Sequence, residues 1–275
     1  MKSLRALFLA PTAAVMILLF FVPLAIVLAY SLLTRGPYGG VLRPWTIENY
    51  LRVFDPLYGE ILWRSTWIAA VATLLCLLLA FPLAFYIARS RRHKILLLNL
   101  VMLPFWTSFL IRIYAWMFLL RDTGLVNTLL EALHVIRAPL PLLFNTGAVI
   151  LGLVYGYLPF MVLPLYATLE KLDEALLDAA ADLGATPFTA LWRVVVPLSK
   201  PGIIAGCLLV FIPCLGAYLT PDLMGGGKTV MIGNLVQNQF TTARDWPFGA
   251  AVSLLLMLIV LLVTRALGNQ GEELL

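Results

Sequence analysis

The feature that most constrains this chain is a series of six apolar segments. A helix needs about 20 consecutive apolar residues to cross a bilayer. The segments are Leu7–Leu33, Ser65–Ala88, Ile95–Leu120, Gly147–Leu169, Gly202–Leu219 and Phe248–Thr264. Hydrophobic residues make up 62% of the 275 positions, well above the ~45–50% of soluble domains. The sequence therefore predicts an all-α integral membrane protein with six transmembrane helices.

The first segment follows Lys2 and Arg5 and has some features of a secretory signal peptide. Its apolar run is longer than the ~7–15 residues of a signal-peptide core, and no clear small-residue cleavage site follows it. We expect it to remain as the first span.

Basic residues predict the orientation. Lys and Arg mostly flank the apolar segments, as topology signals do, so the formal net charge of +5 does not indicate a nucleic-acid partner. Their densest cluster is 89–94, between spans two and three. Because such clusters stay in the cytoplasm, both termini and the long loop between spans four and five are predicted to be cytoplasmic.

The segment 170–201 is the one long polar passage with helical periodicity. Glu174, Asp178 and Asp182 fall four residues apart on one face. Apolar side chains occupy roughly the opposite face, at Leu172, Leu176, Ala179 or Ala180, and Leu183. An acidic stripe favours docking to a basic partner. The alternative is a helix lying on the lipid surface, but such helices carry Lys and Arg on their polar face.

Turn residues divide this passage into two helices. Gly184 suits the left-handed position that ends a helix, and Thr186 with Pro187 forms an N-cap followed by proline at the first helical position. The second helix is predicted to run to Val196, where Pro197 ends it.

The same passage resembles the EAA loop of bacterial ABC-importer permeases, which has the pattern EAA, three residues, Gly, nine residues, then I-x-L-P. Here Asp178-Ala179-Ala180, Gly184 and Val194-Val195-Val196-Pro197 match its spacing. Asp replaces the usual Glu, and two valines replace Ile and Leu. The resemblance implies that 170–201 is a coupling loop seated in a cleft of an ATPase subunit. It assigns this contact to Glu174, Asp178, Ala179, Ala180, Gly184 and Pro197.

Further stretches are similar to the spermidine/putrescine-type permease subunits of such importers. They include 103–112, 152–160, 221–226, 232–234 and 244–249. The resemblance implies a type I importer transmembrane domain over residues 1–275 in a bacterial inner membrane. It also implies a second homologous permease subunit, an ATPase dimer and a periplasmic substrate-binding protein. ATP and magnesium are expected on the ATPase, and no cofactor on this chain.

Seven residues are candidates for the path of a cationic solute, which carboxylates and aromatic faces can hold. They are Arg112, Trp106, Tyr114, Tyr155, Phe211, Tyr218 and Asp222. Arg112 is the one charge well inside a span, which marks it as a functional candidate; the alternative is a side chain that snorkels to the surface. Aromatic residues near span ends also form the ordinary interfacial belt.

Catalytic and metal-binding patterns are absent from the sequence. The segment 222–229 looks like a phosphate-binding loop, but Asp222 stands where that motif needs glycine. Cys76, Cys207 and Cys214 lie in apolar spans, and the two histidines are in different loops. We therefore expect no enzyme active site and no metal.

These observations predict a permease subunit of an ATP-driven importer, moving a small solute such as spermidine or putrescine inward. Two alternatives stay open. One is a gradient-driven secondary transporter or channel, and the other is an ABC importer for a different small solute. An integral-membrane enzyme is disfavoured because no catalytic grouping is visible.

Overall fold

The computed structural model describes residues 10–12, 14–90 and 92–272, with side chains placed through Arg265. The first predicted span therefore begins outside the described residues. Lys2 and Arg5 also lie outside them. The chain forms two compact units: residues up to Glu60 with Leu235–Leu262, and Ile61–Asn234 with the residues from Val263 onward. Each unit is described separately.

The first unit combines the N-terminal helix with a small hairpin and most of the last helix. Its elements are a π-helical turn Ile17–Phe21, α2 Val22–Ser31, β1 Leu33–Arg35, β2 Val41–Trp45, α3 Glu48–Val53, the start of α4 (Pro56–Arg89), most of α14 (Ile232–Thr241) and most of α15 (Trp246–Glu272). The two strands pair antiparallel, with Leu33 opposite Trp45. Sequence periodicity did not predict this hairpin.

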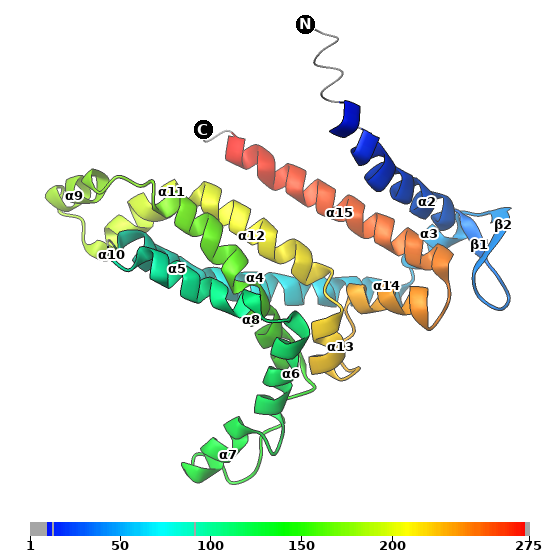
Figure 1. Cartoon of the computed structure of the whole chain (residues 1–275), viewed down its shortest axis with the longest axis horizontal. Coiled ribbons are helices and arrows are strands. Elements are labelled where there is room, and N and C mark those ends of the chain that lie inside the picture. The colour runs from blue at the N-terminus through cyan, green and yellow to red at the C-terminus, as the bar shows by residue number, and fades with distance from the viewer. Residues whose placement is uncertain (1–9, 13, 91, 273–275) are drawn as a thin grey trace, which may run out of the picture. The chain divides into compact units, whose positions relative to one another are not determined.

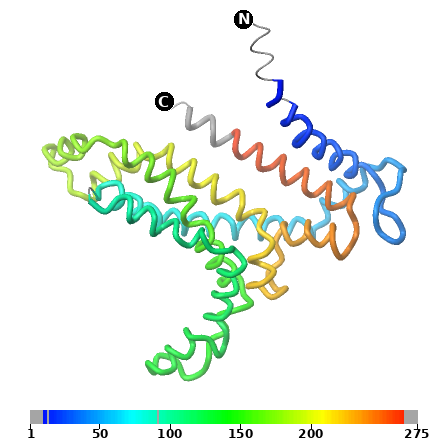
Figure 2. Tube along the Cα trace, viewed as in Figure 1, coloured from blue at the N-terminus to red at the C-terminus, as the bar shows by residue number. Residues whose placement is uncertain are grey.

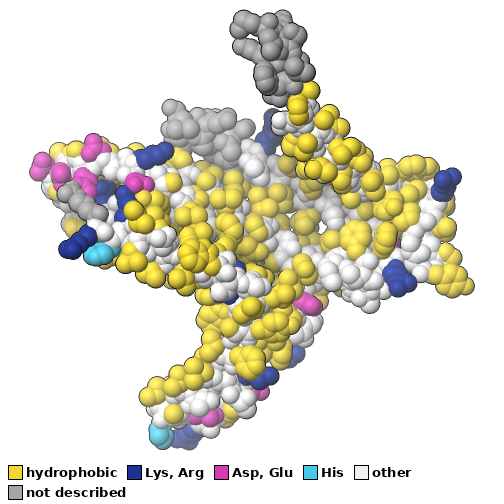
Figure 3. All heavy atoms as spheres, in the orientation of Figure 1, with side chains coloured by type: hydrophobic (Ala, Val, Ile, Leu, Met, Phe, Trp, Pro, Cys, Tyr) yellow, Lys and Arg dark blue, Asp and Glu magenta, His cyan; other side chains and the backbone are white. Residues whose placement is uncertain are grey.

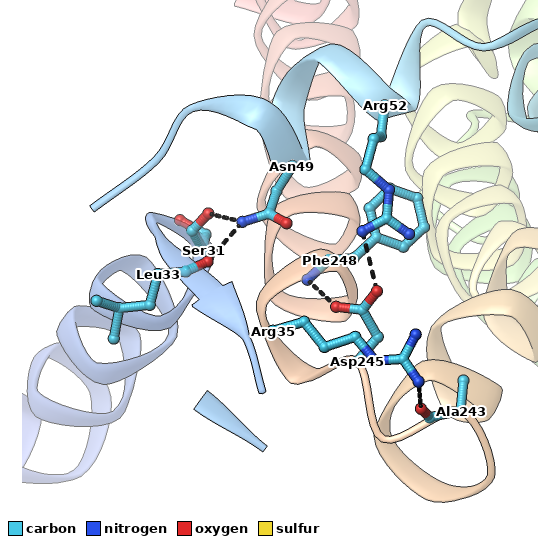
Figure 4. A network of polar contacts seen from close by, with 8 residues as sticks. All are labelled: Ser31, Leu33, Arg35, Asn49, Arg52, Ala243, Asp245 and Phe248. Carbon is cyan, nitrogen blue, oxygen red and sulfur yellow. Dashed lines mark hydrogen bonds and ion pairs between the residues drawn. The ribbon is translucent and has the colours of Figure 1, made fainter. Parts of the chain in front are cut away.

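Polar contacts hold the hairpin and α3 in place (Figure 4). The amide nitrogen of Asn49 donates to the backbone carbonyls of Ser31 and Leu33, at 3.0 and 2.8 Å. The Arg52 guanidinium donates to Asp245 at 2.9 Å and lies 4.3 Å from the ring centre of Phe248. Asp245 is 1% exposed. We call the Arg52–Asp245 ion pair with the Asn49 contacts the polar cluster of the first unit.

Arg35 extends the same cluster by donating to the backbone carbonyl of Ala243 at 2.8 Å. Burial acts to lower the pKa of Arg52, but the hydrogen bond and charge of Asp245 outweigh it and raise that pKa. These contacts join segments about two hundred residues apart in sequence.

The second unit is a bundle in which α8 (Thr146–Leu169) and α12 (Lys200–Leu215) run side by side (Figure 1). Its other helices are the rest of α4, α5 Lys94–Met102, α6 Phe109–Leu120, α7 Leu125–Ala132, α9 Ala175–Asp182, α10 Pro187–Ala190, α11 Val196–Leu198 and α13 Leu219–Gly225. Glycine permits the close contact of α8 and α12. A Cβ on Gly202 would lie 2.5 Å from the Thr168 hydroxyl, and one on Gly206 would lie 2.6 Å from the Met161 sulfur.

The third predicted span is not one continuous helix. Ile95–Leu120 divides into α5, a 3-10 turn Leu103–Trp106 and α6, with an 89° bend at the break (Figure 2). Pro104 lacks an amide donor, and Thr107 and Ser108 adopt extended backbone (ψ 151° and 137°), so the helical hydrogen bonding stops there. Proline alone does not decide this, because α8 contains two prolines and stays one helix.

The fifth predicted span is also shorter than expected. The helix α12 ends at Leu215 rather than Leu219, and Leu219 begins α13. The glycine-rich run then ends α13, with Gly226 in the left-handed conformation at φ +57°. Gly226 thus forms the C-terminal cap of α13.

Four helices of the described chain are long and apolar enough to cross a membrane: Ala10–Ser31, Pro56–Arg89, Thr146–Leu169 and Trp246–Arg265. Two bent pairs pass the same test, Lys94–Trp106 with Phe109–Ala132 at 89° and Pro187–Leu198 with Lys200–Leu215 at 69°. The total is four to six spans, depending on whether each bent pair counts as one.

Candidate functional site

The predicted turn of the 170–201 loop is confirmed. Gly184 has φ +83°, and the amide of Ala185 donates to the carbonyl of Ala180 at 2.9 Å, closing the end of α9. Thr186 accepts a hydrogen bond from the Thr189 amide at 3.2 Å and caps α10. The glycine is needed here because side chains rarely adopt a positive φ.

The outer boundaries of the two helices differ from the prediction. The helix α9 begins at Ala175, three residues after Leu172, the first apolar position of the pattern. The Asp173 carboxylate accepts the Ala175 amide (3.0 Å) and turns the chain before the helix. The second helix continues through Pro197 to Leu198. A π-helical turn, Leu191–Val195, precedes this proline. Such a turn is wider than an α-helix and leaves room for the ring.

The exposed surface of α9 carries both acids and leucines. Asp178 and Asp182 are exposed, and acidic side chains gather over this end of the second unit (Figure 3). Leu176 is 45% and Leu183 is 90% exposed. The predicted apolar face therefore does not pack inward. Two such leucines beside carboxylates form a surface that is open to a partner.

A different face of α9, one position further along the helix, borders a pocket. Leu177 and Ala181 line an apolar cavity of about 870 Å³, together with Phe81 and Phe85 of α4 and Trp192. The sequence pattern did not single out these side chains.

Some of the remaining coupling candidates are exposed, and one contacts another residue of this chain. Ala179 and Pro197 are exposed and Ala180 is half-buried. Glu174 lies 3.3 Å from a guanidinium nitrogen of Arg89. The acidic stripe is thus not uniform, because Glu174 is engaged within the chain whereas Asp178 faces outward.

Arg112 is buried at the break in the third span. It is 9% exposed, and its guanidinium carbon lies 4.9 Å from the Phe105 ring centre and 5.5 Å from that of Phe109. Its Nε and Nη1 atoms have no hydrogen-bond partner among the described residues. The guanidinium does not snorkel, because aromatic faces enclose it.

The other predicted path residues are spread over several elements. Tyr155 of α8 meets Trp116 edge-on at 5.5 Å. Trp106, at the end of the 3-10 turn, is 81% exposed. Tyr114 on α6, Tyr218 before α13 and Asp222 on α13 are exposed, and Phe211 on α12 is half-buried. The sequence did not predict that Phe105 and Phe109 contact Arg112, although all three residues lie in the stretch 103–112.

Comparison with known proteins decides the family. Residues 78–270 match the model described as "Binding-protein-dependent transport system inner membrane component". The chain belongs to this family. It is an inner-membrane transport permease, which confirms the transporter prediction.

Two similar relatives carry the same name. The spermidine/putrescine transport system permease protein PotB of Haemophilus influenzae is 48% identical over 250 residues, covering 90% of this chain and 87% of the relative. PotB of Escherichia coli is 47% identical over 247 residues, covering 89% and 90%. The predicted resemblance to polyamine-type permeases is confirmed.

A solved structure shows the same fold. It is the crystal structure of a bacterial ABC transporter involved in the import of the acidic polysaccharide alginate, with a TM-score of 0.79 at 15% identity. The match covers 99% of this chain and 96% of that chain. This permease therefore has the fold of an ABC-importer membrane subunit.

Sequence patterns missed one set of charged residues in this permease. Lys94 and Arg89 form ion pairs with Glu170 and Glu174, at the base of the 170–201 loop. Lys94 and Arg89 belong to the basic cluster that was interpreted only as an orientation signal. A basic cluster and an acidic loop that are both predicted on one membrane side could have suggested the contact.

Proposed function

We propose that this permease is one of two membrane subunits of an ATP-driven importer for polyamines such as spermidine and putrescine. The polyamine substrate is proposed because the chain is 47–48% identical to PotB permeases over about nine-tenths of its length. An importer for another small solute is the alternative, and the uptake experiment below distinguishes the two.

The membrane arrangement follows from counting each bent pair as one span. The chain then crosses the bilayer six times, as a single domain over 1–275, with both termini and the loop 170–201 in the cytoplasm. The basic cluster at 89–94 supports this orientation. A periplasmic binding protein would deliver the solute from the opposite side.

The loop 170–201 serves as the coupling loop that docks onto a separate ATPase dimer, which holds ATP and magnesium. Support comes from the exposed carboxylates of Asp178 and Asp182 beside Leu176 and Leu183. Apolar side chains that are exposed together can mark a site of protein contact. Closure of the ATPase dimer would move α9 as a rigid body and switch the spans between inward-open and outward-open states.

The path for a cation is compatible with the buried Arg112. The rings of Phe105 and Phe109 lie over its guanidinium. A cationic solute would therefore not contact this charge directly. Exposed Asp222 and the aromatic residues Tyr155, Phe211 and Tyr218 can attract one through carboxylate and cation–π contacts.

Uptake of labelled spermidine and putrescine tests the substrate. Cells that lack polyamine import would express this chain with the ATPase, second permease and binding protein that co-purify with it. We expect ATP-dependent uptake that excess unlabelled polyamine abolishes. Uptake that survives ATP depletion under a clamped ion gradient would favour a secondary transporter, and no polyamine uptake by an assembled complex would favour another solute.

A further inference from the structure

Two ion pairs tie the base of the coupling loop to neighbouring helices. Lys94 Nζ donates to Glu170 Oε1 at 2.5 Å, and Arg89 Nη1 lies 3.3 Å from Glu174 Oε1. Arg89 is the last residue of α4 and Lys94 is the first of α5. Glu170 directly follows α8, and Glu174 directly precedes α9. The four side chains therefore join the ends of four helices.

Aromatic neighbours restrict both cations. The Lys94 ammonium lies 5.7 Å from the ring centre of Tyr166, and the Arg89 guanidinium lies 5.6 Å from that of Phe85. Hydrogen bonds from Lys94 and Tyr166 lower the pKa of Glu170 below its usual range. The Lys94–Glu170 pair is therefore fully ionised near neutral pH.

The pairs are too exposed to be important for folding alone. The Lys94 and Glu170 side chains are 30% and 42% exposed, and those of Arg89 and Glu174 are 22% and 56% exposed. Exposed ion pairs add little to stability because water screens them. Their position between the coupling loop and two spans suggests a different role.

The helices that receive these contacts lead to the break in the third span. From Lys94, α5 runs directly to the turn at Leu103–Trp106, beyond which Arg112 lies buried in α6. From Arg89, α4 runs back along the bundle. A displacement of α9 would therefore act on the end of α4 through Glu174. A displacement of the loop at its first residue, Glu170, would act on the start of α5.

We propose that the Lys94–Glu170 and Arg89–Glu174 pairs are transmission contacts, which pass movement of the coupling loop to α4 and α5. Arg89 and Lys94 are then positioning residues for the coupling of ATP hydrolysis to transport. This inference rests on the proposed function of the loop.

The test measures solute molecules imported per ATP hydrolysed, using the complete importer in proteoliposomes with spermidine as the solute. Lys94→Glu is expected to leave ATP hydrolysis within about twofold of the parent and to lower the ratio about 3- to 30-fold. Lys94→Glu combined with Glu170→Lys restores the pair with its charges exchanged, and is expected to recover most of the ratio.

Arg92→Glu is the matched control. Arg92 belongs to the same short loop and is exposed, and it has no ion pair among the residues that the structure describes. Reversing its charge should leave the ratio unchanged. A fall equal to that of Lys94→Glu would mean that loop charge matters rather than the pair, and would overturn the proposal.

Two further outcomes contradict the transmission role. One is a Lys94→Glu importer with the parental ratio, and the other is an exchanged pair that stays uncoupled while its complex assembles normally. If Lys94→Glu fails to assemble, Lys94→Gln replaces it, with the same expected direction and the same contradicting result. A parent complex without ATP-dependent spermidine uptake would reject the proposed function itself, and with it this inference.

Discussion

The polar cluster of the first unit and the ion pairs at the coupling loop use the same chemistry in different surroundings. In the first, Arg52 meets an Asp245 that is 1% exposed. In the second, Lys94 and Glu170 are 30% and 42% exposed. Burial of one carboxylate makes the first contact costly to lose, whereas the second exchanges readily with water.

This difference indicates what each contact does. Arg52 is 37% exposed, but the Asp245 carboxylate is buried and also caps the start of α15 by accepting the Phe248 amide (3.3 Å), so this ion pair fixes a fold. Half-exposed pairs between helix ends stabilise little, so they can open and close as the helices move. We therefore expect the polar cluster of the first unit to stabilise the fold, and the ion pairs at the 170–201 loop to affect transport more than stability.

The largest expected effect is on the structural cluster. Asp245→Ala removes the acceptor of Arg52 and leaves its guanidinium without that partner, which should cost about 1.5–3 kcal/mol of unfolding free energy. Denaturant unfolding in detergent measures the loss. Asp122→Ala, at an exposed carboxylate, should cost far less; equal losses would contradict the structural role of Asp245.

The second effect is on the 170–201 loop, for which we propose the coupling role. Gly184→Val places a β-branched residue at φ +83°, a strain of about 1–3 kcal/mol that should distort the turn and uncouple transport from ATP hydrolysis. Gly184→Asn should keep most transport, because Asn tolerates the left-handed conformation. Transport by the valine variant at the parental rate would contradict the coupling role.

The third effect concerns docking. Asp178→Lys should weaken binding of the ATPase about tenfold or more, because a like charge would face the basic partner. Titration of the purified ATPase onto the permease in nanodiscs measures the affinity. Asp122→Lys makes the same charge change in another loop and should bind normally. Unchanged affinity for Asp178→Lys would remove this carboxylate from the interface.

The smallest effect is the pH dependence of the Lys94–Glu170 pair. Because the folded state lowers the pKa of Glu170, the pair stabilises the protein above the usual glutamate pKa and is lost as pH falls through the lowered value. The melting temperature of the parent minus that of Glu170→Gln should stay constant from about pH 8 to 6 and shrink below about pH 4. A difference that changes between pH 6 and 8 would contradict this assignment.

Sequence reasoning succeeded where the determining contacts are local. Gly184 and Thr186 fix their turn within a few residues, so pattern alone predicted the αL glycine and the N-cap. The pairs Arg52–Asp245 and Lys94–Glu170 lie 193 and 76 residues apart, and no local pattern marks them.

The break in the third span shows a second limit. Pro104 was visible in the sequence, yet α8 contains Pro159 and Pro164 and remains one helix. What separates them is the extended backbone of Thr107 and Ser108 after the 3-10 turn. The presence of a proline therefore does not by itself predict whether a span bends or divides.

The most direct test of the account is quantitative mass spectrometry of the complex that co-purifies with this permease from its native membrane. The parent is compared with a variant in which residues 175–184 are replaced by a glycine–serine linker, leaving Glu170 and Glu174 in place. The account predicts that an ATPase and a second permease accompany the parent, and that the folded variant keeps the second permease and loses the ATPase. Equal recovery of the ATPase with both proteins, or a parent that purifies alone, would contradict it.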